Sequence, residues 1–178
     1  MRDDAPQGSC ARKVLVAGIG NIFLGDDRFG VEVVRRLPER PLPEGVRVID
    51  FGIRGFDLAM ALREGYETAI LVDAIHRGSA PGFLHVFELT PEDLGASTAR
   101  DLFVEAHALD PVKVLRLARA LGGPLPRVVV VGCEPATVEE NCAMQLSEPV
   151  AAAVDQAIAR IEALVAEALM ATSGKRGL

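Results

Sequence analysis

The sequence lacks tryptophan and has a single tyrosine, so it offers no set of aromatic side chains on which bases or sugars would stack. It has 19 lysine and arginine residues against 25 acidic ones, a net charge of −6, and no basic cluster denser than the pair Arg35-Arg36. A nucleic-acid partner needs a stripe of basic residues to neutralise its phosphates. We therefore expect no nucleic acid among the partners of this chain.

Long apolar runs and a cysteine framework are also missing. No apolar run reaches the ~18 residues of a membrane span, although hydrophobic residues make up 49% of the 178 residues. The first residues lack the apolar core of a secretory signal. The three cysteines, Cys10, Cys133 and Cys142, include no C-x-x-C pair and fit neither a disulfide scaffold nor a zinc ribbon. We expect a cytoplasmic protein without a membrane partner.

Short β-branched runs alternate with segments of helical period along the chain. Strands are expected at residues 14–17, 46–49, 69–72, 83–89 and 128–131, and helices near residues 29–37, 56–62, 109–121 and 147–169. This alternation predicts a single three-layer α/β/α domain with a mainly parallel sheet of about five strands. The segment 83–89 alternates in period two after a Pro-Gly turn, so it is the candidate for an antiparallel edge strand. The domain is expected to span residues 13–170, between flexible arms at 1–12 and 171–178.

A glycine-rich loop follows the first expected strand, with the sequence Gly18-Ile-Gly20-Asn21-Ile-Phe-Leu-Gly25-Asp26-Asp27. A dinucleotide-binding fingerprint has the spacing G-x-G-x-x-G, but here the third glycine comes two positions late. The two carboxylates that follow it would repel a pyrophosphate, which makes a Rossmann-like cofactor module the weaker interpretation. In a purely structural interpretation, the glycines permit a tight turn and Asp26 or Asp27 caps the helix expected near Arg28.

A second acid, Asp73, ends the third expected strand at the sheet edge where Asp27 is also expected. Two acids at one edge repel each other unless a cation lies between them. An imidazole is available from His76, from His85 in the alternating strand, or from His107 ahead of the third helix. Two carboxylates and one imidazole suit a borderline divalent ion such as nickel or zinc, with positions left open for a further ligand.

Other common hydrolase motifs are absent from the sequence. It has no G-x-S-x-G elbow, no H-E-x-x-H and no G-x-x-x-x-G-K-[ST] phosphate loop. Cys133 ends an apolar strand and could pair with His107 as a nucleophile, although a small residue in that place more often serves packing. A purely structural interpretation also stays open for the other candidates. In it each aspartate is a cap or a loop hydrogen-bonding group, and His107 is a solvated loop residue without a function.

Four blocks of the sequence occur in a fixed order. They are Gly18-Ile-Gly20-Asn21 with the acid Asp27, Asp50-Phe-Gly-Ile-Arg-Gly55, Asp73-Ala74, and Gly132-Cys-Glu134-Pro135. Together they resemble the hydrogenase maturation proteases, the endopeptidases that trim the C-terminal extension from the large subunit of [NiFe]-hydrogenases. The resemblance runs from about Lys13 to Leu169. It departs from the family pattern at Arg28, which stands where a glycine is common.

The resemblance implies that Asp27, Asp73 and His107 bind metal, with His85 as the fallback ligand. It also implies that the protease recognises nickel already placed in the large-subunit precursor, so that the substrate supplies the metal, although other divalent ions would also fit. Asp27 and Asp73 are then the candidate catalytic residues, because either a metal or a carboxylate can activate the attacking water. The residues expected along the substrate loops are Gly20, Asn21, Asp26 and Gly55. The competing interpretation is a non-catalytic, nickel-sensing or chaperone-like partner of the large subunit.

Overall fold

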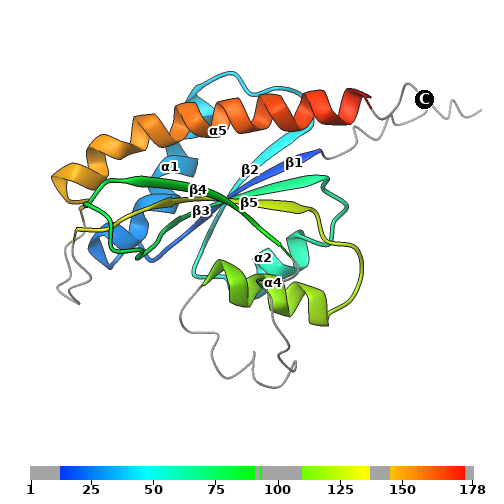
Figure 1. Ribbon diagram of the computed structural model, residues 1–178, viewed down its shortest axis with the longest axis horizontal. Helices are drawn as coiled ribbons and strands as arrows, with labels where there is room; N and C mark the ends of the chain where they lie inside the picture. The colour runs from blue at the N-terminus through cyan, green and yellow to red at the C-terminus, as the bar shows by residue number, and fades with distance from the viewer. Residues whose placement is uncertain (1–12, 91–92, 94–109, 137–144, 175–178) are drawn as a thin grey trace, which may run out of the picture.

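The computed structural model describes residues 13–90, 93, 110–136 and 145–174, and these build one sheet covered by helices on both faces. The elements in chain order are β1 (Val14–Ile19), the 3-10 helix η1 (Gly25–Arg28), α1 (Phe29–Arg36), the 3-10 helix η2 (Leu37–Glu39), β2 (Val46–Gly52), α2 (Gly55–Ala61), β3 (Thr68–Ala74), β4 (Leu84–Leu89), α4 (Pro111–Ala120), β5 (Arg127–Cys133) and α5 (Glu148–Gly174). In Figure 1, α1 and α5 lie on one face of the sheet, and α2 and α4 lie on the other.

The strand order is β2-β1-β3-β5-β4. All neighbouring strands are parallel except β4, which runs antiparallel to β5 at the edge of the sheet. The predicted α/β architecture is therefore confirmed, including the antiparallel edge strand. Because β1, β3 and β5 are parallel, the loops that follow them meet at one edge of the sheet, and the candidate residues at their ends lie there.

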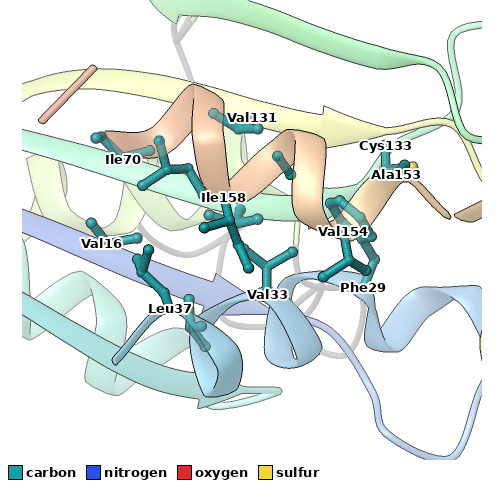
Figure 2. Close-up of a cluster of buried hydrophobic side chains, with 14 of the residues drawn as sticks. Val16, Phe29, Val33, Leu37, Ile70, Val131, Cys133, Ala153, Val154 and Ile158 are labelled. Atoms are coloured by element: carbon teal, nitrogen blue, oxygen red, sulfur yellow. The ribbon is translucent and has the colours of Figure 1, made fainter. Parts of the chain in front are cut away.

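Each face of the sheet has its own hydrophobic core. Figure 2 shows the core beneath α1 and α5, where Val16, Ile70 and Val131 of the strands contact helix residues that include Phe29 and Ile158. The opposite core contains strand and helix residues such as Leu15, Leu58, Leu71, Leu115 and Val130. Central strands covered on both faces are apolar at nearly every position, which is why β1, β3 and β5 appear in the sequence as short continuous apolar runs.

Helix α1 can pack directly against the backbone of the sheet because Gly30 has no side chain. A Cβ atom at this position would overlap the carbonyl oxygens of Val72 and Ile19. Close-packed interiors do not absorb such an overlap without shifting backbone. Gly30 thus sets the helix directly over β1 and β3, and this brings η1, immediately before the helix, to the carboxyl end of β3.

Two sequence expectations about helix ends need correction. Neither η1 nor α1 has a side-chain cap, so the purely structural interpretation, in which Asp26 or Asp27 caps this helix, is wrong. Helix α5 continues to Gly174, so residues 171–174 are helical and do not belong to the expected C-terminal arm. The alanine, leucine and methionine residues that precede position 172 favour helix, and Gly174, at its end, opposes it. Residues 1–12 and 175–178 lie outside the described residues.

No helix within the described ranges is both long and apolar enough to span a membrane.

Candidate active site at the carboxyl edge of the sheet

Asp73 occupies the next-to-last position of β3 and is 3% exposed. Its Oδ1 atom accepts a hydrogen bond from the N–H of Ala74 at 2.9 Å. Burial raises the pKa of Asp73 well above its usual value, and the negative charges of Asp27 and Asp110 raise it further, against the opposing effect of the Ala74 hydrogen bond. The ionised form of Asp73 is thus unfavourable in the protein alone, and a cation placed beside it would relieve that cost.

Asp27 lies on η1, near enough to Asp73 for its charge to act on that carboxyl group. The Asp27 Oδ2 atom accepts a hydrogen bond from the Asn21 N–H at 2.7 Å, which folds its carboxylate back over the loop that follows β1. Gly20 makes this approach possible, since its φ is 133° and a Cβ atom there would overlap the carbonyl oxygen of Asp27. Gly20 therefore serves the placement of the acid Asp27.

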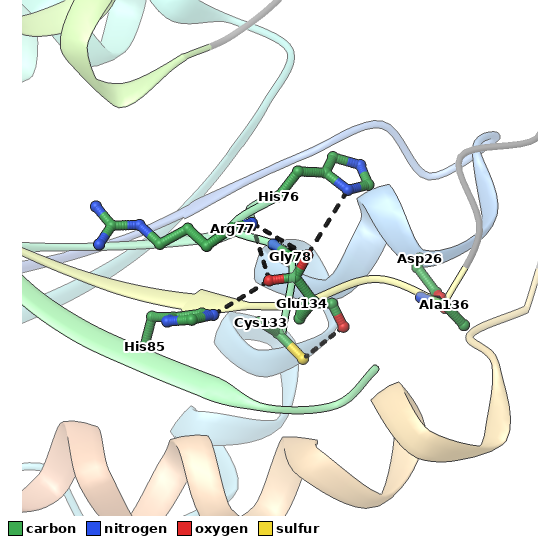
Figure 3. A network of polar contacts seen from close by, with 8 residues as sticks. All are labelled: Asp26, His76, Arg77, Gly78, His85, Cys133, Glu134 and Ala136. Carbon is green, nitrogen blue, oxygen red and sulfur yellow. Dashed lines mark hydrogen bonds and ion pairs between the residues drawn. The ribbon is translucent and has the colours of Figure 1, made fainter. Parts of the chain in front are cut away.

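Asp26, the neighbour of Asp27 in the chain, points to different partners. It is 3% exposed, and its carboxylate accepts hydrogen bonds from the N–H of Ala136 (2.8 Å), the N–H of Ser147 (2.6 Å) and the Ser147 hydroxyl (2.8 Å). Ala136 follows β5, and Ser147 directly precedes α5. Asp26 thus joins η1 to the end of β5 and to the beginning of α5, and its side chain lies close to Ala136 in Figure 3.

Glu134 is the residue of the site whose role the sequence analysis missed. Its side chain is 5% exposed, and its carboxylate accepts hydrogen bonds from the N–H groups of Arg77 (2.9 and 3.0 Å) and Gly78 (3.0 Å), and also from that of Ser79. His85 Nε2 lies 3.2 Å from Glu134 Oε2 (Figure 3). Burial raises the pKa of Glu134, but these hydrogen bonds outweigh it and bring the pKa down to about 2. The available signal in the sequence was a charged residue placed directly after a buried strand.

The histidines differ in how the structure places them. His107 lies outside the described residues. His85 contacts Glu134. Gly132 of β5 pairs with Asp73 of β3 on one side and with His85 of β4 on the other, so it lies between them in the sheet. The Ile75 side chain covers that glycine. His76 is an exposed residue 3.9 Å from Glu134. Within the described part of the chain, no three His, Cys, Asp or Glu side chains are grouped as metal ligands would be.

A pocket of about 540 Å³ opens beside Asp73. Its wall includes His76 and Arg77 from the loop after β3, and Asp110, whose carboxylate accepts a 2.8 Å hydrogen bond from the Val112 N–H at the beginning of α4. The Arg77 guanidinium lies 3.8 Å from the centre of the Phe87 ring, so a cation–π contact fixes it against β4. The pocket is lined by the buried carboxylate of Asp73 and by further ionisable groups, an arrangement that is typical of an active site.

A second, shallower groove of about 360 Å³ follows the glycine loop. Gly20 and Asn21 line it from one side, and the segment from Asp50 to Arg54 lines it from the other. Gly55, also expected along a substrate loop, is the first residue of α2 and directly follows this segment. Phe23 (58% exposed) and Ile53 (65% exposed) present apolar surface at the groove.

Cys133 does not have the properties of a nucleophile. Its side chain is fully buried, and burial together with the charges of Asp26 and Glu134 raises the pKa of its thiol to about 12. The reactive form of a cysteine is the thiolate, which is scarcely populated at neutral pH under these conditions. The packing interpretation of Cys133 therefore fits its surroundings.

The fold and the site together define an α/β protein with buried acids at the carboxyl edge of a mainly parallel sheet. The family model described as hydrogenase maturation protease matches residues 31–164. The hydrogenase expression/formation protein HupM of Azotobacter chroococcum is 36% identical over 158 residues, which are 86% of this chain and 72% of the relative. A putative hydrogenase maturation protease of Methanocaldococcus jannaschii is 34% identical over 149 residues, which are 83% of this chain and 92% of the relative.

Solved structures give the same result. The hydrogenase maturating endopeptidase HybD from E. coli superposes with a TM-score of 0.69 at 27% identity, over 87% of this chain and 93% of that one. A hydrogenase 2 maturation peptidase from a Thaumarchaeota archaeon superposes with a TM-score of 0.64 at 32% identity, over 85% and 97% of the two chains. The chain belongs to the hydrogenase maturation protease family, and its enzyme class is accordingly that of an endopeptidase of hydrogenase maturation.

Proposed function

We propose that this endopeptidase acts in the cytoplasm on the large-subunit precursor of a [NiFe]-hydrogenase and removes its C-terminal extension once nickel has been inserted. Nickel belongs to the substrate in this proposal, and Asp27, Asp73 and His107 contact it in the complex. Membership in the family supports the processing of a hydrogenase precursor. The observation that supports metal recognition is the placement of Asp27 near buried Asp73, where the charge of Asp27 opposes the ionisation of Asp73.

The donor set fits a borderline divalent ion. Asp27 and Asp73 each use one carboxylate oxygen for a backbone hydrogen bond, and neither Oδ1 of Asp27 nor Oδ2 of Asp73 bonds to any residue that the structure describes. His107 adds an imidazole, three positions before pocket residue Asp110, and three residues of chain span at most about 10 Å. Carboxylate oxygen with imidazole nitrogen suits nickel, and also zinc or another divalent ion.

The two aspartates are also the groups that we assign to the hydrolysis. An ionised Asp73 or Asp27 accepts a proton from the attacking water as its oxygen bonds to the scissile carbonyl carbon. The same proton then passes to the amide nitrogen as the carbon–nitrogen bond breaks, which releases the C-terminal peptide. One carboxylate can serve both steps, because it first accepts and then donates the same proton.

The experiment that tests this function measures the intact mass of a cognate large-subunit precursor, nickel-loaded and nickel-free, after incubation with the protein. We expect loss of a C-terminal peptide only from the loaded form. Asp73→Asn and His107→Ala should abolish the cleavage, whereas Asp57→Asn, which changes an exposed aspartate on α2, should leave it unchanged. Processing at the normal rate by the Asp73 or His107 variant would refute the assignment of that residue. Stable binding of loaded precursor without mass loss would instead favour a non-catalytic partner.

A further inference from the structure

The loop that follows β3 owes its path to one buried carboxylate. Glu134 accepts main-chain hydrogen bonds from Arg77 and Gly78 at 2.9 to 3.0 Å and one from Ser79, and its own N–H donates to the Phe83 carbonyl at 2.9 Å. Its carbonyl accepts from the Gly82 N–H at 2.8 Å. Glu134 thus binds the loop near its middle and again near its end, where the chain enters β4.

This loop begins immediately beyond the candidate catalytic aspartate. Only Ala74 and Ile75 separate Asp73 from His76. The Ile75 N–H donates to the Cys133 carbonyl at 2.9 Å, and the next two residues then form part of the wall of the pocket beside Asp73. The shape of that wall therefore depends on where the main chain of residues 76–79 is held.

We propose that Glu134 is a positioning residue for the peptidase reaction, whose carboxylate fixes the loop of residues 76–79 so that the precursor segment bound in the pocket is held correctly against Asp73. The inference rests on the proposed function, because it takes Asp73 as a residue of the reaction. Glu134 does not face the pocket itself and acts only through the loop. The His85 ring contacts the Glu134 carboxylate as well (Figure 3). This ring also lies 4.9 Å from the Phe83 ring in an edge-on contact.

Three variants separate positioning from simple stabilisation. Glu134→Ala removes all the acceptors of the side chain. Glu134→Gln keeps one acceptor oxygen for the loop. Its NH2 group replaces the other oxygen and cannot accept a hydrogen bond from a loop N–H group. Glu162→Gln is the matched control, since it alters an exposed glutamate of α5 that pairs with Arg40 at 3.1 Å. Each variant is expected to fold, which circular dichroism checks before the kinetics are measured.

The expected result is a graded loss of kcat. We expect Glu134→Ala to lower kcat by roughly ten- to a hundredfold and Glu134→Gln by about threefold to tenfold, because displacements of about 1 Å near reacting groups cost factors of this order. The KM for nickel-loaded precursor should stay within about threefold of that of the wild type, because the rest of the docking surface is unchanged. Glu162→Gln should match the wild type in both constants.

Hydrogen exchange gives an independent measurement on the free protein. The amides of Arg77 and Gly78 should exchange faster in both Glu134 variants, while the amides of β1 and β3 keep their protection. Wild-type exchange at these two amides would overturn the proposal, and so would faster exchange with an unchanged kcat. If the alanine variant does not fold, the glutamine variant decides alone, and it must show both effects.

The two proposals can fail separately. If the wild-type protein does not cleave the loaded precursor, the proposed function is wrong, whatever the exchange data show. If the wild type cleaves and the Glu134 variants cleave equally well, the function stands and the positioning role of Glu134 is wrong.

Discussion

The three hydrogen bonds of the Asp26 carboxylate lead to a prediction about stability that can be worked out in numbers. Asp26→Ala deletes the acceptor shared by the Ala136 N–H, the Ser147 N–H and the Ser147 hydroxyl. Asp26 is 3% exposed, so solvent has little access to replace it at the two main-chain donors. The variant should lose the link between η1 and the ends of the two elements that Asp26 joins.

The magnitude follows from the kind of hydrogen bond that is lost. A hydrogen bond to a charged group contributes about 1.5–3 kcal/mol, and a buried donor left without a partner costs about 1–3 kcal/mol. These contributions are not additive, and removal of a buried charge recovers part of the cost, so we expect a net loss of about 3 kcal/mol. For a chain of this size that corresponds to a fall in Tm of roughly 6–12 °C.

Urea denaturation followed by circular dichroism measures this change, with thermal unfolding as the second observable. Asp57→Ala is the control, because its carboxylate forms a 3.5 Å pair with Arg54 at the surface and should contribute less than about 0.5 kcal/mol. Asp26→Asn keeps one acceptor oxygen, so its loss of unfolding free energy should lie between those of Asp26→Ala and Asp57→Ala. A loss for Asp26→Ala no larger than that for Asp57→Ala would refute the argument that this carboxylate joins the elements.

Three further predictions concern other groups around the site. Asp73→Asn should raise the Tm at neutral pH. Because the pKa of Asp73 is raised in the folded protein, its contribution to stability is present below its usual pKa of 3.8 and is lost as the pH rises through the folded pKa. The gain in Tm over the wild type should therefore vanish in acid. The pH dependence contributed by Glu134 is the reverse, because folding lowers its pKa from 4.5 to about 2. Its contribution to stability is present above pH 4.5 and is lost between about pH 4.5 and 2. Acid unfolding of Glu134→Gln should lack this loss of stability. Cys133→Ala should retain peptidase activity in the mass assay, at a cost in unfolding free energy of about 1 kcal/mol for the lost packing of one sulfur atom; an inactive but folded variant would restore the cysteine as a candidate nucleophile.

Much of the fold was predictable because parallel strands covered on both sides leave a clear pattern. The strands β1, β3 and β5 are buried at nearly every position, so each appears as a short apolar run between helical segments. The turn before β4 and its alternating sequence indicated the antiparallel edge. The beginning of α1 was less predictable, because two adjacent aspartates resemble a helix cap and only the tertiary structure supplies other partners for them.

The placement of Asp27 and Asp73 at one edge of the sheet was predictable, whereas their hydrogen-bond partners were not, and their roles in metal binding and catalysis stay predictions. Asp26 and Asp27 are chemically identical and adjacent, but a 3-10 turn advances by about 120° per residue, so their carboxylates point to different partners. The position of Glu134 directly after a buried strand was a signal in the sequence, but its partners were not predictable, since they are main-chain N–H groups that every non-proline residue carries. His107 stays a prediction, because it lies outside the described residues.

A carboxylate that binds main-chain N–H groups makes no demand on the side chains of the residues it holds. Arg77 and Ser79 can be exchanged for almost any residue other than proline without loss of a Glu134 hydrogen bond, whereas Gly78 is restricted by its φ of 79°. The path of the loop and the chemistry of its side chains are thereby separable. The hydrogen bonds to Glu134 can thus keep the path of the loop while a change of Arg77 alters the pocket wall, which makes residue 77 the natural position for engineering precursor selectivity.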